Sequence, residues 1–275
     1  MLTPGEFIEA YNGIGAKKAM SPAWRLLGLA VLAGVLIGMG AVVSNTAAHG
    51  LQDNLSVSRV VCGLLFPFGL VMVLFTGAEL FTGNCLITIS ALSGRARWGG
   101  MVRNLVIVYI GNLVGAVALA ALVVYSGQLD LSGGQLAVFT IQTAVSKCSL
   151  PFGRALVLGV LCNVLVCVGV ACGLCGKDGP SKALGAYLPV AFFVIGGFEH
   201  CVANMYYIPA GLLALGNSGY AQLAAEAGLA LDNLSWAAFF LQNLVPVTLG
   251  NVLGGCGFAA LMWGMHRTRE PARAA

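Results

Sequence analysis

The sequence is poor in charge: Asp, Glu, Lys and Arg make up 9% of its 275 residues, whereas soluble domains carry about 25%. A net charge of +4, dispersed over several segments, is too dilute for a nucleic-acid partner. The histidines are His49, His200 and His266, with no His-x3-His pair for a metal ion. A Gly-x-Ser-x-Gly nucleophile motif and a Gly-rich phosphate loop are also missing. These absences argue against an enzyme, a cofactor, a metal centre and an ATP-driven pump.

Nine cysteines are present, but their arrangement does not form a metal-binding pattern. Cys172 and Cys175 have a Cys-x-x-Cys spacing, and no second pair follows at the spacing of a structural zinc site. Together with Cys162 and Cys167 they lie in one apolar stretch. We expect them to be small packing residues in membrane-buried helices.

Apolar sequence dominates the chain, since 59% of its residues are hydrophobic. An α-helix needs about 20 apolar residues to cross a membrane. Six stretches reach that length, and two exceed it by so much that two half-helices are favoured over one rod. The 38 glycines suit close packing of such helices. The six predicted spans cover residues 26–44, 60–92, 102–125, 155–175, 184–215 and 236–263.

Two of these stretches are interrupted in the same way. Glu79 follows Gly77 and precedes Asn84, and Glu199 lies in the matching Gly-x-Glu pattern ahead of Asn204. Ionisable groups at membrane depth cost several kcal/mol and are candidates for a functional site. Unwound backbone in a membrane is tolerated where it lines a cavity or is buried in protein. The two matched breaks therefore predict a translocation site.

The two halves of the chain resemble each other. Spans three and six match without gaps at seven identical positions, and spans two and five share the breaks. Three spans per half force the halves into opposite orientations, and such inverted repeats are typical of transporters and channels. We expect one channel domain over 1–275, with a cytoplasmic helix at 1–24 and repeats at 25–125 and 151–265. The identical pairs are Asn104/Asn243, Leu105/Leu244, Val106/Val245, Val108/Val247, Gly111/Gly250, Asn112/Asn251 and Gly115/Gly254.

Basic residues set the expected topology. Cytoplasmic loops of membrane proteins are enriched in Lys and Arg, and alternate segments of this chain hold eleven of them against three. We therefore expect a multi-pass protein of the cell inner or plasma membrane with both termini cytoplasmic. The predicted inner residues are Lys17, Lys18, Arg25, Arg95, Arg97, Arg103, Lys177, Lys182, Arg267, Arg269 and Arg273, and the outer ones are Arg59, Lys147 and Arg154.

The first twenty residues predict a short helix. Thr3 and Glu6 have the spacing of a capping box, so the helix should begin there and continue to about Met20. Its apolar residues would form an amphipathic anchor at the cytoplasmic membrane surface. These residues are Phe7, Ile8, Tyr11 and Ile14.

Over residues 5–265 the sequence resembles the formate/nitrite transporter family, which includes formate, nitrite and hydrosulfide channels. The resemblance implies an aquaporin-like six-helix protomer, a homopentamer and one pore per protomer. Five motifs in order carry it: residues 80–84 (LFTGN), 104–115, 162–167 (CNVLVC), 197–209 (GFEHCVANMYYIP) and 243–255 (NLVPVTLGNVLGG).

The resemblance also implies roles for single residues. His200 corresponds to the family's central pore histidine, Thr82 to its partner, and Lys147 to the lysine ahead of span four. Asn163 and Asn251 correspond to pore-facing asparagines. The hydrophobic constrictions correspond to Phe66, Leu70, Phe81, Val166 and Phe193.

From these residues we expect Lys147 to attract a small anion and His200 to supply or relay a proton, so that the permeant crosses as a weak acid. In the competing mechanism His200 stays neutral and donates a hydrogen bond. Glu79 and Glu199 should have structural roles, bonding backbone amides freed at the breaks or bridging protomers. Asn84 and Asn204 belong to the same breaks, and repeat symmetry favours Asn104 and Asn243 as partners of the freed backbone.

The expected function is a channel for small monovalent anions, with formate favoured and hydrosulfide or nitrite as alternatives. The formate-channel branch of the family has Ser-Thr where this chain has Gly83 and Asn84, and Gly-Asn is closer to other branches, including hydrosulfide channels. A neutral-solute channel of the aquaporin type is less favoured because paired Asn-Pro-Ala motifs are missing.

Overall fold

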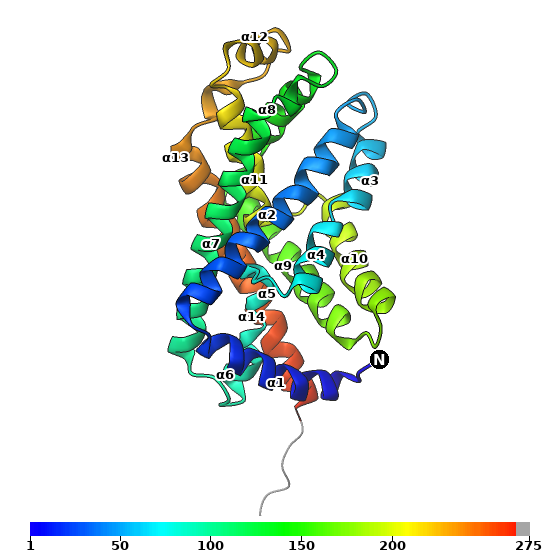
Figure 1. Ribbon diagram of the computed structural model, residues 1–275, viewed down its shortest axis with the longest axis vertical. Helices are drawn as coiled ribbons and strands as arrows, with labels where there is room; N and C mark the ends of the chain where they lie inside the picture. Colours follow the sequence, from blue (N-terminus) through cyan, green and yellow to red (C-terminus); the bar gives the residue numbers. More distant parts are fainter. Residues whose placement is uncertain (268–275) are drawn as a thin grey trace, which may run out of the picture.

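The computed structural model describes residues 1–267, and in that range the chain consists of helices and connecting turns without a β-strand (Figure 1). Five helical segments are long and apolar enough to cross a membrane, namely Ala23–Ala48, Leu55–Thr76, Trp98–Tyr125, Phe152–Cys175 and Trp236–His266. The remaining predicted span, 184–215, consists of two shorter apolar helices, as the prediction of two half-helices for this stretch requires. The described part of the chain is therefore all-helical, as expected for a multi-pass membrane protein, and five of its apolar segments are long spans. Arg269 and Arg273 lie outside the described residues.

The helices follow each other with short connections. The first half contains α1 (Pro4–Met20), α2 (Ala23–Ala48), α3 (Leu55–Leu65), α4 (Phe68–Thr76), α5 (Phe81–Asn84), α6 (Ile87–Leu92) and α7 (Trp98–Tyr125). The second half contains α8 (Gln135–Cys148), α9 (Phe152–Cys175), α10 (Gly179–Ile195), α11 (Cys201–Ala214), α12 (Ser218–Glu226), α13 (Trp236–Ala238) and α14 (Val245–His266). Short η elements lie at η1 (Gln128–Asp130), η2 (Leu231–Asn233) and η3 (Phe239–Leu244), the last of them a π-helical turn that leads into α14.

Glycines allow two pairs of long helices to pack closely. α2 packs along α7, and α9 packs along α14. A Cβ atom at Gly115 of α7 would overlap the backbone carbonyl of Val31, and one at Gly254 of α14 would overlap that of Val160. These two glycines are a matched pair of the sequence repeat. Their identity therefore reflects equivalent helix crossings, at which only a hydrogen side chain leaves room.

The outer faces of the long helices carry large apolar side chains that the rest of residues 1–267 leaves uncovered. Leu122 of α7, Phe192 of α10 and Leu261 of α14 are each more than half exposed. In water such a surface would be unfavourable, whereas in a membrane it faces lipid tails. The exposed apolar faces thus agree with the membrane class that composition predicts.

The amino-terminal helix is capped as predicted but lies in a different environment. Thr3 and Glu6 form the capping box, and α1 ends at Met20. The prediction of a surface anchor is wrong for Phe7, Ile8 and Tyr11, which are at most 2% exposed. The reason is that α1 packs on α6 and α14 and buries its apolar face in the protein core (Figure 1).

Candidate functional site

A histidine and a threonine meet at the centre of the molecule. His200 Nε2 lies 2.9 Å from Thr82 Oγ1, and the two residues are 3% and 0% exposed. Thr82 belongs to the short helix α5, and His200 is the residue that caps α11 at its N-terminus. We refer to Thr82 and His200 as the central pair.

Each member of the central pair follows a break between two helices. α4 ends at Thr76 and α5 begins at Phe81, and in the second half α10 ends at Ile195 and α11 begins at Cys201. Gly77 has φ +67° and Gly197 has φ +69°, a left-handed conformation that glycine adopts without a steric cost. The glycine of each Gly-x-Glu pattern therefore ends a helix and turns the chain toward the central pair.

Two buried asparagines hold the backbone of the first residues after the breaks. Asn112 Oδ1 accepts from the backbone N–H of Phe81 at 2.9 Å, and its amide donates to the carbonyls of Ala30 and Glu79. Asn251 makes the matching bonds, accepting from the N–H of Cys201 at 2.9 Å and donating to two carbonyls. A buried, unpaired amide would cost about 1–3 kcal/mol, so these side chains stabilise the breaks.

The carboxylate of the first break is paired with a lysine. Lys18 of α1 lies 2.7 Å from Glu79 and also donates to Asn84 Oδ1 at 3.0 Å. The amide of Asn84 donates to Glu79 and to Asn104 Oδ1, and Asn104 in turn donates to the carbonyl of Lys18. We call Lys18, Glu79, Asn84 and Asn104 the first quartet.

The second break carries an equivalent group, the second quartet of Lys147, Glu199, Asn204 and Asn243. Lys147 lies 2.9 Å and 3.1 Å from the two carboxylate oxygens of Glu199. Asn204 donates to Glu199 and to Asn243 Oδ1, and Asn243 donates to the carbonyl of Lys147. The lysines come from α1 and α8, which lie at opposite ends of the molecule (Figure 1).

The structure around the two breaks differs from the sequence expectation in three respects. Glu79 and Glu199 bond lysine and asparagine side chains rather than freed backbone amides. Asn104 and Asn243 form hydrogen bonds within the two quartets and do not hold the freed backbone. Asn112 and Asn251 hold the backbone at the breaks instead. Lys147 lies in the last turn of helix α8 rather than in a loop.

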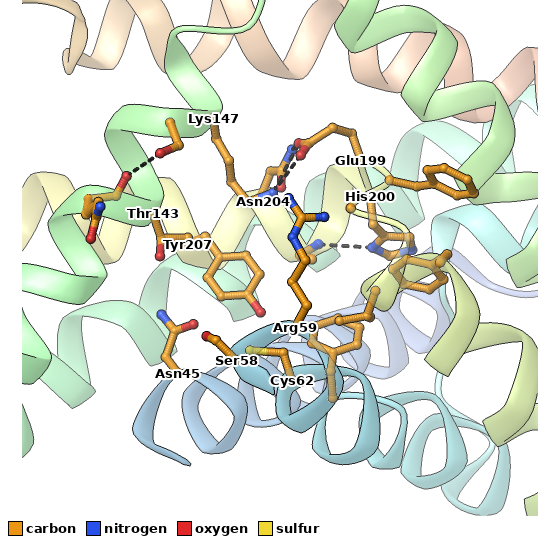
Figure 2. A pocket seen from close by; sticks show the side chains of 18 of the residues that line it. Asn45, Ser58, Arg59, Cys62, Thr143, Lys147, Glu199, His200, Asn204 and Tyr207 are labelled. Atoms are coloured by element: carbon orange, nitrogen blue, oxygen red, sulfur yellow. Dashed lines mark hydrogen bonds and ion pairs between the residues drawn. The ribbon is translucent and has the colours of Figure 1, made fainter. Parts of the chain in front are cut away.

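A cavity of about 430 Å³ leads to the central pair from one end of the molecule. Lys147, Glu199 and His200 lie on one wall, and Arg59 and Tyr207 also line the cavity (Figure 2). We call it the Lys147 cavity. Its charged lining residues are two cations and one carboxylate, so its wall is net positive.

Aromatic rings close the inner end of the Lys147 cavity. Phe66 and Phe193 meet edge to face with their centroids 5.9 Å apart, and Phe193 stacks on the imidazole of His200 at 5.8 Å. Phe66 is 2% and Phe193 is 4% exposed. A bare ion loses its hydration at such an apolar constriction, which costs far more than it does for a neutral molecule.

A second cavity, of about 240 Å³, approaches the central pair from the α1 side. Lys18, Glu79 and Asn84 line it, and so do Leu70 and Gly83, the residue after Thr82. We call it the Lys18 cavity. Two cavities, each with a lysine–glutamate pair in its wall, thus lead toward one buried threonine–histidine contact.

Four other residues that were expected along the pathway are buried near the central pair or elsewhere in the core and do not line either cavity. Asn163 is fully buried and donates to the carbonyl of Thr82 at 3.3 Å, which helps to hold the central pair. Phe81 packs edge to face on Tyr109 at 4.9 Å, and Val166 is 1% exposed. Phe81, Val166, Asn163 and Asn251 are not among the lining residues of either cavity.

Sequence reasoning missed the role of Lys18, which it treated only as an inner basic residue. The signal that could have found it is the repeat itself, because Lys18 precedes Glu79 as Lys147 precedes Glu199. Arg59 was likewise counted only for topology, and Tyr207 was not among the expected site residues. Both line the Lys147 cavity, and the Lys147 ammonium lies 5.3 Å from the centre of the Tyr207 ring.

Comparison with known proteins gives one consistent family. A family model described as formate/nitrite transporter matches residues 5–265. The formate channel FocA of Escherichia coli (strain K12) is 35% identical over 98% of this chain and 96% of its own. A probable formate transporter of Methanothermobacter thermautotrophicus is 33% identical, over 98% of each chain.

Comparison with solved structures leads to the same family. A pentameric formate channel with formate bound has a TM-score of 0.79 and 34% identity, covering 90% of this chain and 98% of its own. An ion channel of the same family has a TM-score of 0.82 and 26% identity, covering 96% and 99%.

Proposed function

The chain belongs to the formate/nitrite transporter family, and we propose that it is a channel for small monovalent anions of weak acids, with formate as the favoured permeant. Its relatives are channels and transporters rather than enzymes. The observation that carries the proposal is the Lys147 cavity, which has a net positive wall and ends at the central pair behind an aromatic constriction. A positive wall concentrates anions at the entrance.

The central pair supplies a hydrogen-bond donor beyond the constriction. His200 Nδ1 accepts from the backbone N–H of Ala203 at 3.1 Å, so the proton of a neutral imidazole is on Nε2 and points to Thr82. The threonine hydroxyl, having accepted that bond, keeps its own proton for a permeant oxygen. This arrangement supports the mechanism in which His200 stays neutral over the one in which it supplies a proton.

We further propose two inverted halves, each with a broken helix, assembled as a homopentamer with both termini cytoplasmic in the cell membrane. The two quartets support the repeat, because each joins a lysine, a glutamate and two asparagines through equivalent bonds. Each half-helix after a break begins near the central pair, where the positive end of the helix dipole favours an anion. A related structure is described as a pentameric formate channel, which supports the oligomer.

Hydrosulfide and nitrite are the alternative permeants. Gly83 and Asn84 favour the hydrosulfide alternative, since they differ from the Ser-Thr of the formate branch, and Asn84 lies in the first quartet beside the Lys18 cavity. A neutral-solute channel is less favoured because both cavities are lined by ion pairs.

The test is a flux assay with purified protein in proteoliposomes. Formate, nitrite, hydrosulfide and glycerol are compared at external pH values from about 5 to 8, the range in which histidine titrates. We expect saturable formate uptake that exceeds glycerol uptake at each pH. Fast glycerol flux without anion flux would contradict the proposal, and faster hydrosulfide than formate flux would select the alternative.

A further inference from the structure

The Lys147 cavity contains one cation that no carboxylate neutralises. Among residues 1–267, the ion pairs are Lys18 with Glu79 and Lys147 with Glu199. Glu199 contacts Lys147 through both carboxylate oxygens, so the charge of Lys147 is largely compensated within the wall. Arg59 is in neither pair and is exposed to the cavity. The net positive charge of the cavity is therefore the charge of Arg59.

The position of Arg59 places this charge directly ahead of the constriction. Arg59 lies on α3 about two helical turns, or roughly 10 Å, before Phe66. Its guanidinium donates to the carbonyl of Ile195 at 3.4 Å, a long bond at the end of α10. A Cβ atom at Gly197 would overlap the guanidinium, so the glycine that forms the second break also leaves room for the arginine.

A second group in the same cavity lacks a partner. The Asn45 side chain is 5% exposed, and its amide Nδ2 makes no hydrogen bond within the described residues. It lies on the α2 wall next to Ser58 of α3 (Figure 2). A buried donor without a partner costs about 1–3 kcal/mol. A small polar ligand in the cavity would offset that cost by accepting a hydrogen bond from Asn45 Nδ2.

We propose that Arg59 is an anion-capture residue, which binds small planar anions with two terminal oxygens before they reach the constriction. This rests on the proposed function, and it goes further by assigning selectivity among permeants to one residue and to Asn45 as its auxiliary donor. The guanidinium carries a row of N–H donors in a fixed plane and binds two oxygens at once. Formate and nitrite have two such oxygens, whereas hydrosulfide presents one sulfur atom.

A lysine at position 59 would keep the charge and lose the planar fork, and a glutamine would lose both. Two variants therefore separate attraction from recognition. In Arg59→Gln we expect initial formate and hydrosulfide rates at low ionic strength to fall by about tenfold, with a weaker salt dependence than in the wild type. In Arg59→Lys hydrosulfide flux stays near the wild-type rate, and the formate-to-hydrosulfide ratio falls by roughly fivefold.

Arg154 provides the matched control. It is exposed in the first turn of α9 and does not line the Lys147 cavity, so Arg154→Gln removes the same charge elsewhere and should keep the wild-type rates. Asn45→Leu should raise the half-saturating formate concentration without lowering the thermal unfolding temperature, because the lost amide has no protein partner.

The results would differ if the only role of Arg59 were to cap the end of α10 through its bond to Ile195. Both Arg59 variants would then unfold at a lower temperature, and the ratio of formate to hydrosulfide flux would equal that of the wild type, which overturns the inference. Equal losses in Arg154→Gln and Arg59→Gln would overturn it as well. A wild-type protein that conducts no formate would refute the proposed function and this inference together, whereas a conducting wild type with unaltered Arg59 variants refutes the inference alone.

Discussion

The Nδ1 atom of His200 accepts a hydrogen bond from the backbone N–H of Ala203, with the two nitrogens 3.1 Å apart. This bond gives the first turn of α11 its N-terminal cap. It also restricts the imidazole, because a proton on Nδ1 would point at another N–H and break the cap. The neutral ring, with its proton on Nε2 and directed at Thr82, satisfies both contacts at once.

Replacing His200 with asparagine tests this reading. Asparagine is a favoured N-cap residue, and its side-chain oxygen can accept from Ala203 in place of Nδ1. We expect His200→Asn to fold, and its formate uptake to keep the wild-type pH dependence between about pH 5 and 8 at a lower maximal rate. The rate falls because Thr82 loses its donor. A flat pH profile in the variant would instead identify His200 as the group that exchanges protons.

The buried ion pair of the first quartet gives a prediction about stability. The side chains of Lys18 and Glu79 are 23% and 9% exposed. Lys18→Met leaves the Glu79 carboxylate buried without its cation, which costs about 3–5 kcal/mol. The double variant Lys18→Met/Glu79→Gln removes both charges and should regain most of this loss. The thermal unfolding temperatures of both variants in detergent measure these changes. If the two variants are equally destabilised, Lys18 does not stabilise the protein through its charge.

The breaks could be read from the sequence, because a glycine two residues before a glutamate inside an apolar run conflicts with a continuous membrane helix. The pairing of Lys18 with Glu79 was missed, and the repeat was the one sequence signal for it. The residues are 61 positions apart, and it is the packing of α1 that brings them together. For the same reason Phe7 and Tyr11 were predicted at a membrane surface. The covering helices, α6 and α14, come much later in the chain.

The repeat gave correct pairs of asparagines but could not assign their roles. Asn104 and Asn112 lie two turns apart on the same helix and are both fully buried. They have the same side chain, and the sequence contains no information about which of them faces the break. Their roles follow from the distance of each turn of α7 to Phe81 and to Asn84, which only the fold determines.

Two glycines of α14 should respond in opposite ways to alanine. A methyl group at Gly254 would overlap the Val160 carbonyl of α9, whereas one at Gly257 meets no atom within 4 Å. We expect Gly254→Ala to destabilise the protein by about 1–3 kcal/mol through overpacking. Gly257→Ala should stabilise it by about 0.5–1 kcal/mol, since alanine is the better helix former. Thermal unfolding of both variants checks the pair, and a stable Gly254→Ala protein would mean that α9 and α14 can separate.

The aromatic constriction predicts which permeants are excluded by size. Phe66 packs edge to face on Phe193 and stacks on Tyr207 at 6.4 Å, so Phe66→Ala opens the inner end of the Lys147 cavity. Removing a buried phenyl ring also costs about 3–5 kcal/mol of stability. We expect acetate and lactate uptake to rise relative to formate uptake in proteoliposomes. Phe68→Ala is the control, because Phe68 is 54% exposed on α4 and lines neither cavity. If the relative uptake of the larger acids is the same in both variants, Phe66 does not set the width of the path.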